Sequence, residues 1–155
     1  MNKKYELTDE TIGVGGCKLY RIRALRDFGN VKAGDLGGFI ESEENLSYES
    51  DCWVGENARV YENAWISENA RVFGNACVYE DAQVSEMSKI FGNARVFGNA
   101  WVLGTAKIFG DAWMFGDALA YGDMKLDSGM WNQTIEVDDR YYLISTTLKK
   151  ILMEW

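Results

Sequence analysis

Hydrophobic and polar residues alternate in a six-residue repeat through the middle of the chain. In nearly every hexad the first residue is small and the third is aliphatic, while the fifth and sixth are Gly or Glu followed by Asn or Asp. Thirteen hexads run from Cys52 to Gly129: CWVGEN, ARVYEN, AWISEN, ARVFGN, ACVYED, AQVSEM, SKIFGN, ARVFGN, AWVLGT, AKIFGD, AWMFGD, ALAYGD and MKLDSG. A period of six is not helical, because apolar residues two apart followed by a gap of four match a strand interrupted by a turn.

Each hexad is therefore predicted to form a short strand followed by a corner. Residues one and three face the interior, and residues two and four face outward, since successive side chains of a strand point to opposite faces. Gly and Asn at the corner suit a backbone with positive φ. Similar hexads recur every eighteen residues, as in FGNACV, FGNARV and FGDAWM. Three hexads should therefore make one coil of a triangular prism with about four coils.

The prediction is an all-β fold, and the repeat resembles the left-handed parallel β-helix of the hexapeptide-repeat family. The family pattern places Leu, Ile or Val four residues before a small residue, and this chain meets it at Val60 and Ala64, Val72 and Ala76, and Val96 and Ala100. The segment LYRIRALRDFGNVKAGDLGGFIES also resembles the lead-in of uncharacterised hexapeptide-repeat proteins from enterobacterial and phage genomes. That second resemblance implies no established activity.

One compact domain with three parts is expected. Residues 1–51 form N-terminal strands and a lead-in, in which GVGG at Gly13–Gly16 is a turn and not a phosphate loop, since no Lys-Ser or Lys-Thr follows it. Residues 52–129 form the β-helix. Residues 130–155 form a C-terminal cap, a hairpin and a final helix, which should cover the open end of the solenoid.

Outward residues eighteen apart should stack in columns, and one predicted face carries cations beside phenylalanines. Like charges at about 4.8 Å spacing repel one another unless solvent or an anionic partner relieves them. A groove that holds phosphate or carboxylate on the cations while the rings stack a base would use this arrangement. A solvated face with cation stems lying over the rings is the alternative that the sequence leaves open. The predicted ligand-binding residues are Arg71, Lys89, Lys107, Lys125, Phe73, Phe91 and Phe109.

Other outward aromatic residues make a large apolar surface that a second copy of the chain should cover. The family resemblance implies a trimer about an axis parallel to the helix. Stacking between neighbouring coils is the structural alternative for the same residues. The predicted oligomer interface consists of Tyr61, Tyr79, Phe97, Phe115, Trp65, Trp101 and Trp113.

Composition narrows the classes of partner and location. The 155 residues include 24 acidic and 16 basic side chains, for a net charge of -8, which argues against general nucleic-acid binding. The N-terminus lacks the apolar segment of a signal peptide or membrane span, so a cytoplasmic protein is expected. The three cysteines have no close pair, which fits neither a disulfide framework nor a zinc site, and no metal or cofactor is expected.

The absence of histidine bears on catalysis. The best-known hexapeptide-repeat enzymes are acyltransferases in which a histidine is the general base, and this chain has no histidine at all. Glu68 or Glu86 would have to replace it, but a carboxylate is a weak base at neutral pH unless it is buried. The sequence therefore predicts a protein that is not an enzyme.

Three hypotheses about function follow. The first is a non-catalytic homotrimer that binds a small anionic or nucleotide-like ligand, as would a phage protein that sequesters a signalling nucleotide of a host defence. The second is a protein-binding or DNA-mimicking module that captures a basic host protein with acidic corner residues. The third is an acyltransferase relative without the usual base. The corner acids of the second hypothesis are Glu62, Glu80, Asp81, Asp117 and Asp123.

Overall fold

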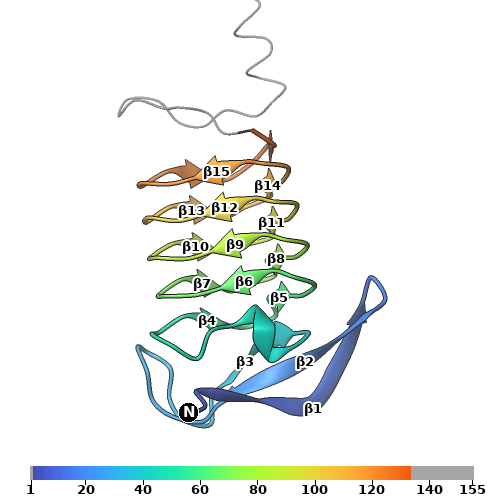
Figure 1. The fold of residues 1–155 in the computed structure, drawn as a ribbon, viewed down its shortest axis with the longest axis vertical. Helices are drawn as coiled ribbons and strands as arrows, with labels where there is room; N and C mark the ends of the chain where they lie inside the picture. Colours follow the sequence, from blue (N-terminus) through green and yellow to red (C-terminus); the bar gives the residue numbers. More distant parts are fainter. Residues whose placement is uncertain (1, 134–155) are drawn as a thin grey trace, which may run out of the picture.

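The computed structural model describes residues 2–133, and these form an all-β parallel solenoid with one short 3-10 helix (Figure 1). The predicted fold class is confirmed. No helix in this part of the chain is long and apolar enough to cross a membrane. The predicted C-terminal hairpin and helix lie in residues 134–155, outside the described residues.

Three parallel ladders form the walls of the solenoid, and each strand pairs with the strand of the next coil. The four-stranded sheet consists of β6 (Trp65–Ile66), β9 (Gln83–Val84), β12 (Trp101–Val102) and β15 (Leu119–Ala120). The five-stranded sheet consists of β4 (Trp53–Val54), β7 (Arg71–Val72), β10 (Lys89–Ile90), β13 (Lys107–Ile108) and β16 (Lys125–Leu126). Partners in these two sheets are eighteen residues apart, as predicted. The left-handed sense of the coil stays a prediction.

The third ladder is an eight-stranded sheet that begins with antiparallel strands and continues as a parallel stack. Its strands, in order, are β1 (Tyr5–Val14), β2 (Cys17–Ala24), β3 (Leu36–Ile40), β5 (Arg59–Val60), β8 (Cys77–Val78), β11 (Arg95–Val96), β14 (Trp113–Met114) and β17 (Met130–Trp131). The hairpin of β1 and β2 turns at Gly15 and Gly16, both at positive φ, which confirms the predicted turn. The helix η1 (Glu43–Asn45) follows β3.

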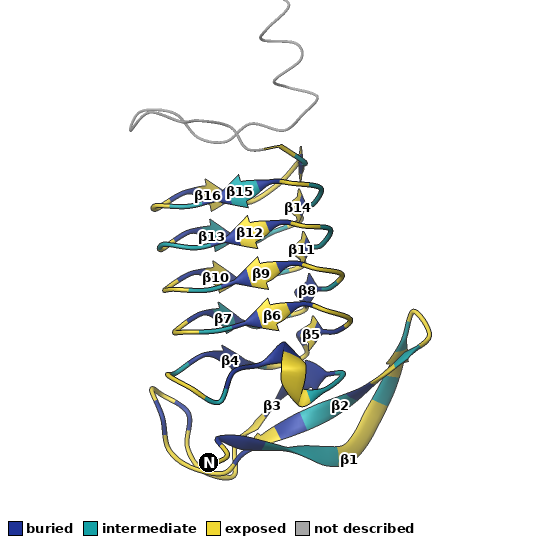
Figure 2. Ribbon diagram, in the orientation of Figure 1, coloured by how far each residue is buried: buried dark blue, intermediate teal, exposed yellow. Residues whose placement is uncertain are grey.

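The interior is lined by the first and third residues of each hexad, and in Figure 2 dark blue buried segments recur in every coil between exposed and intermediate ones. Ala94 and Val96 are fully buried examples. One first residue is polar instead of hydrophobic. It is Ser88, whose buried hydroxyl donates to the Ser85 carbonyl at 2.7 Å. Small first residues leave room for the corner, and aliphatic third residues fill the centre of each coil.

The corners take positive φ at the fifth residue of the hexad, where either Gly or Glu stands. In the first twelve hexads the sixth residue is not at positive φ, so the prediction that Asn serves this purpose is wrong; in the last hexad the sixth residue, Gly129, takes it. The backbone N–H of Asn93 instead donates to the carbonyl of Gly110 in the next coil at 2.8 Å. Its side-chain amide lies 3.4 Å from Asp111 Oδ1, so Asn and Asp at this position link successive coils.

The N-terminal segment closes one end of the core. The side chain of Tyr5 is fully buried there, and its hydroxyl donates to the Leu46 carbonyl at 2.6 Å. The ammonium of Lys4 is buried as well, donates to the Cys52 carbonyl at 2.7 Å and lies 4.9 Å from the centre of the Phe28 ring. Burial lowers the pKa of Lys4 and raises the pKa of Cys52.

At the other end the coil spacing shortens by one residue. Trp113 pairs with Met130, seventeen residues on, and Met114 pairs with Trp131. The indole of Trp131 is buried, and its Nε1 donates to the Ser128 carbonyl at 2.7 Å. The parallel stack therefore continues past Gly129, where the hexad pattern ends.

Candidate ligand-binding face

The outward second residues of the five-stranded sheet form the basic column, defined as Arg71, Lys89, Lys107 and Lys125. Each is the direct Cα partner of the next across the parallel ladder. Lys89 and Lys125 are exposed, and Arg71 and Lys107 are half-buried. Within residues 2–133, none of the four forms an ion pair with an acidic side chain.

The outward fourth residues form the phenylalanine column, defined as Phe73, Phe91 and Phe109. The Phe73 and Phe91 rings stack with centroids 5.0 Å apart and planes 3° from parallel, and the Phe91 and Phe109 rings do so at 5.0 Å and 5°. Both faces of Phe91 are thus covered by its neighbours. Phe91 therefore has no free ring face on which a base could stack.

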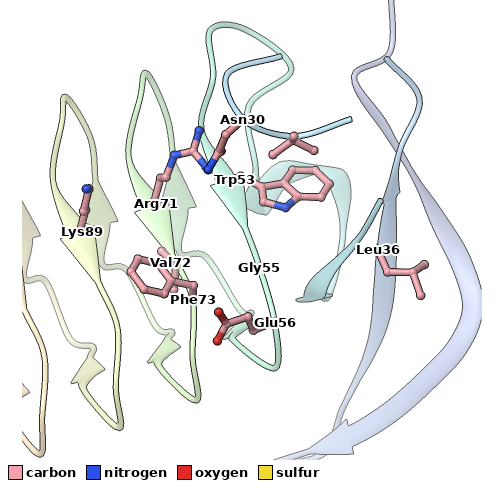
Figure 3. A pocket seen from close by; sticks show the side chains of 10 residues that line it. Asn30, Leu36, Trp53, Gly55, Glu56, Arg71, Val72, Phe73 and Lys89 are labelled. Atoms are coloured by element: carbon pink, nitrogen blue, oxygen red, sulfur yellow. The ribbon is translucent and has the colours of Figure 1, made fainter. Parts of the chain in front are cut away.

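A cavity of about 410 Å³ opens at the N-terminal end of these two columns (Figure 3). Arg71, Phe73 and Lys89 line it, whereas the other predicted ligand-binding residues, Phe91, Lys107, Phe109 and Lys125, lie further along the face. Its volume falls within the range of ordinary small-molecule sites, about 300–1,000 Å³. The structure therefore gathers three of the seven predicted residues around one cavity.

The other residues of the cavity wall were not predicted from the sequence. Residues Asn30, Val31 and Leu36 come from the lead-in between β2 and the first coil. Asn30 Oδ1 accepts a hydrogen bond from Arg71 Nη1 at 2.5 Å, which ties this loop to the basic column. A loop residue has no period that would reveal its position.

The first hexad supplies the floor with Trp53, Gly55 and Glu56. Trp53 is 6% exposed and packs edge-on against Phe28, with ring centroids 5.2 Å apart. Glu56 Oε2 accepts from the Gly74 backbone N–H at 3.0 Å. One signal was visible in the sequence: CWVGEN has Trp where later coils of this face have a cation, and Gly where they have Phe.

The second predicted column is partly covered by the chain itself. Rings of Tyr61, Tyr79, Phe97 and Phe115 stack at centroid distances of 4.9 to 5.1 Å. Tyr61 is only 7% exposed and clusters with Leu19 of β2 and Phe39 of β3. Burial raises the pKa of Tyr61 to about 12. Residues of its own chain therefore cover Tyr61, which leaves little of this side chain for contact with a second copy.

The remaining predicted interface residues lie on two different walls. Trp65 and Trp101 belong to the four-stranded sheet and are 37% and 48% exposed. Trp113 belongs to the eight-stranded sheet, is 39% exposed and has Arg95 over its ring at 5.5 Å. The seven residues therefore do not form one surface.

A second cavity of about 460 Å³ lies along the eight-stranded sheet. Corner side chains of successive coils line one part of it, and outward strand residues line the rest. The corner residues are Asn57, Asn75, Asn93 and Asp111, and the strand residues are Arg59, Cys77, Arg95 and Trp113. Burial raises the pKa of the Cys77 thiol, which keeps it protonated and makes it a poor nucleophile. This cavity offers hydrogen-bonding groups without an activated side chain.

The acidic residues of the protein-binding hypothesis and the two candidate general bases, Glu68 and Glu86, lie at exposed corners. Glu86 Oε2 accepts from the Gly104 backbone N–H at 2.5 Å, and Asp81 Oδ1 accepts from Asn63 Nδ2 at 3.1 Å. Along the corner that carries Glu62 and Glu80, the next two coils have glycine. The acids are thus interrupted and do not form a continuous stripe. Residues 2–133 contain no cluster of three potential metal ligands among His, Cys, Asp and Glu.

Comparison with known proteins supports the repeat architecture. The model of the YdcK beta-solenoid repeat matches residues 70–86 and 89–104, in the middle of the solenoid. These segments include Arg71 and Lys89 but not the cavity floor at Trp53 and Gly55. A search of curated proteins found no match.

Proposed function

We propose that the protein is a non-catalytic binding protein that holds a small anionic ligand on its basic column. The supporting observation is the register of the four cations without an acidic partner among residues 2–133. They stand on a chain whose net charge is -8, so acidic side chains for pairing are abundant elsewhere.

Neighbouring cations of the basic column repel one another, and this repulsion lowers stability unless an anion binds between them. Neighbouring coils bring the column's side chains to about 4.8 Å spacing at their bases, where like charges directly opposite destabilise a sheet. An anion bridging Arg71 and Lys89 would relieve this repulsion and would gain charge-assisted hydrogen bonds. The hydrogen bond from Arg71 to Asn30 supports this proposal, since it limits the freedom of the guanidinium group.

The non-catalytic part of the proposal rests on the chemistry of the chain. It has no histidine, and Glu68 and Glu86 are exposed at the corners. An exposed carboxylate lacks the apolar surroundings that make such a group a useful general base. A protein that binds without turning its ligand over acts by lowering the concentration of free ligand.

We propose further that the protein is a homotrimer. Trp65 and Trp101 are exposed on the four-stranded sheet, where Leu103 and Leu119 are partly exposed beside them. Aromatic side chains of this size are typical of the centre of an interface. Native mass spectrometry should give a trimer for the unaltered chain and a monomer for Trp101→Glu. A monomeric unaltered chain contradicts this part of the proposal without affecting anion binding.

The test of ligand binding is calorimetry with pyrophosphate on the full chain. Lys89→Glu combined with Lys107→Glu should abolish binding, because Lys89, which bridges the anion with Arg71, and its ladder partner Lys107 both become anions. The control is Lys18→Glu, which reverses the charge of one exposed lysine on β2, away from the basic column, and so makes half of the charge change of the double variant. Equal affinity of the double variant and the control would refute the proposal.

A further inference from the structure

The phenylalanine column has an empty place at its N-terminal end. The fourth residues of successive coils on this face are Gly55, Phe73, Phe91 and Phe109. A Cβ placed on Gly55 would lie 3.7 Å from Phe73 Cβ, so the glycine is the next member of the same column. Phe91 covers one face of the Phe73 ring, and no other ring within residues 2–133 stacks on the opposite face.

The walls of this empty place carry complementary polar groups. Trp53 borders it, with Cδ1 at 3.6 Å and Nε1 at 3.8 Å from the Cβ position of Gly55. The indole N–H of Trp53 donates to no acceptor within residues 2–133. Glu56, at the adjacent corner, has one carboxylate oxygen on the Gly74 N–H and the other oxygen available to accept.

Charge is distributed unequally around the cavity. Figure 3 shows the guanidinium of Arg71 beside Asn30 at one end of the first coil's strand, and the Glu56 carboxylate beyond Gly55 at the other. A ligand that fits this polarity has an anionic group near Arg71 and Lys89. Near Glu56 and Trp53 it has a ring edge with both a hydrogen-bond donor and an acceptor.

We infer that the cavity above Gly55 binds a planar heteroaromatic ring that extends the phenylalanine stack, with a linked phosphate on Arg71 and Lys89. This inference rests on the proposed anion binding and names the ligand class as a nucleotide. The ring takes the position of the missing aromatic side chain against Phe73. Such a stacking contact strengthens binding about tenfold, at the lower end of measured base–aromatic energies.

The decisive variant is Gly55→Phe. Gly55 is not at positive φ, and its added Cβ meets neighbours at 3.6 to 3.8 Å, which is ordinary van der Waals contact. The new ring should therefore complete the stack and raise the melting temperature while it fills the binding place. The matched control is Asp127→Phe, because Asp127 occupies the corresponding fourth position beyond Phe109 at the other end of the column.

The probes are adenosine 5′-monophosphate and ribose 5-phosphate, measured by calorimetry on the full chain. Both probes carry the same ribose phosphate, and only adenosine 5′-monophosphate carries a heteroaromatic base. The unaltered protein and Asp127→Phe should bind the nucleotide about tenfold more tightly than ribose 5-phosphate. Gly55→Phe should abolish the tenfold preference, so that this variant binds the nucleotide no more tightly than it binds ribose 5-phosphate.

The outcomes separate this inference from the proposed function. Equal affinity of the unaltered protein for both probes overturns the ring site while anion binding stands. A Gly55→Phe variant that keeps the tenfold preference overturns it as well. A third outcome is that the unaltered protein binds the nucleotide but not ribose 5-phosphate, and that Gly55→Phe binds neither. In that case the ring site stands and the basic column is not the anion site. If neither probe binds, the ring site is overturned, and the pyrophosphate experiment decides whether anion binding stands.

Discussion

Nη1 of Arg71 lies 2.5 Å from Oδ1 of Asn30, so a loop that precedes the solenoid orients the first cation of the basic column. Arg71 belongs to β7, and Asn30 lies 41 residues earlier in the chain. This contact links the N-terminal lead-in to the proposed site, and it is open to a direct test.

Replacement of Asn30 by Ala should weaken pyrophosphate binding about fivefold, because the arginine then loses more rotamer freedom when it meets the anion. Calorimetry measures the affinity. Asn63→Ala is the control, since it removes a side-chain amide that bonds Asp81 at another corner. Unchanged affinity of Asn30→Ala would show that the loop does not orient Arg71 for binding.

Removal of one charge from the basic column should make the ligand-free protein more stable and the complex weaker. Lys107→Gln relieves repulsion from its direct partners Lys89 and Lys125. We expect the free energy of unfolding to rise by a few tenths of a kcal/mol at low salt, and this gain to shrink as salt screens the charges. Urea unfolding at two salt concentrations measures it. A loss of stability, or a gain that salt does not alter, contradicts repulsion within the column.

Substitution of corner glycines separates backbone strain from crowding between coils. Gly92 has φ +65°, and an added Cβ would lie 2.8 Å from the Gly110 nitrogen. Gly122 has a similar φ of +58° but nothing within 4 Å of that position. Gly122→Ala should destabilise the protein by about 1 kcal/mol, and Gly92→Ala by about 3 kcal/mol, because only the latter must also push coils apart. Equal losses in chemical unfolding would mean that the coils adjust freely.

Alkaline pH should reveal the burial of Tyr61 under the N-terminal hairpin. Its pKa is raised from 10.0 to about 12, so the folded protein retains a proton that the unfolded chain releases. The folded state therefore binds more protons between these values, and this tyrosine makes stability fall as pH rises from 10 to 12. Tyr61→Phe should show a smaller loss of stability across that window.

Tyr121→Phe provides the comparison for this alkaline experiment, because Tyr121 lies on a different wall and away from the hairpin. Urea unfolding at the two ends of the window measures the difference for each variant. The same pH dependence in Tyr61→Phe and the unaltered protein would contradict the contact of Tyr61 with Leu19 and Phe39.

The repeat itself was predictable because its information is local. An alternation of small and aliphatic residues with a period of six identifies the inward positions, and the eighteen-residue recurrence is enough to pair Lys89 with Lys107. The stacking of Phe73 on Phe91 follows from the same arithmetic. The shortened spacing before Trp131 was not predictable, because the hexad pattern ends at Gly129.

The amino-acid sequence by itself determined which side chains face outward and which stack, since a parallel ladder joins each residue to its equivalent in the next coil. Only the tertiary structure decided which outward columns stay open. The hairpin of β1 and β2 buries Tyr61, and the lead-in loop places Asn30 and Leu36 around the cavity above Gly55. These contacts join segments far apart in sequence through packing, and packing has no period from which it can be read.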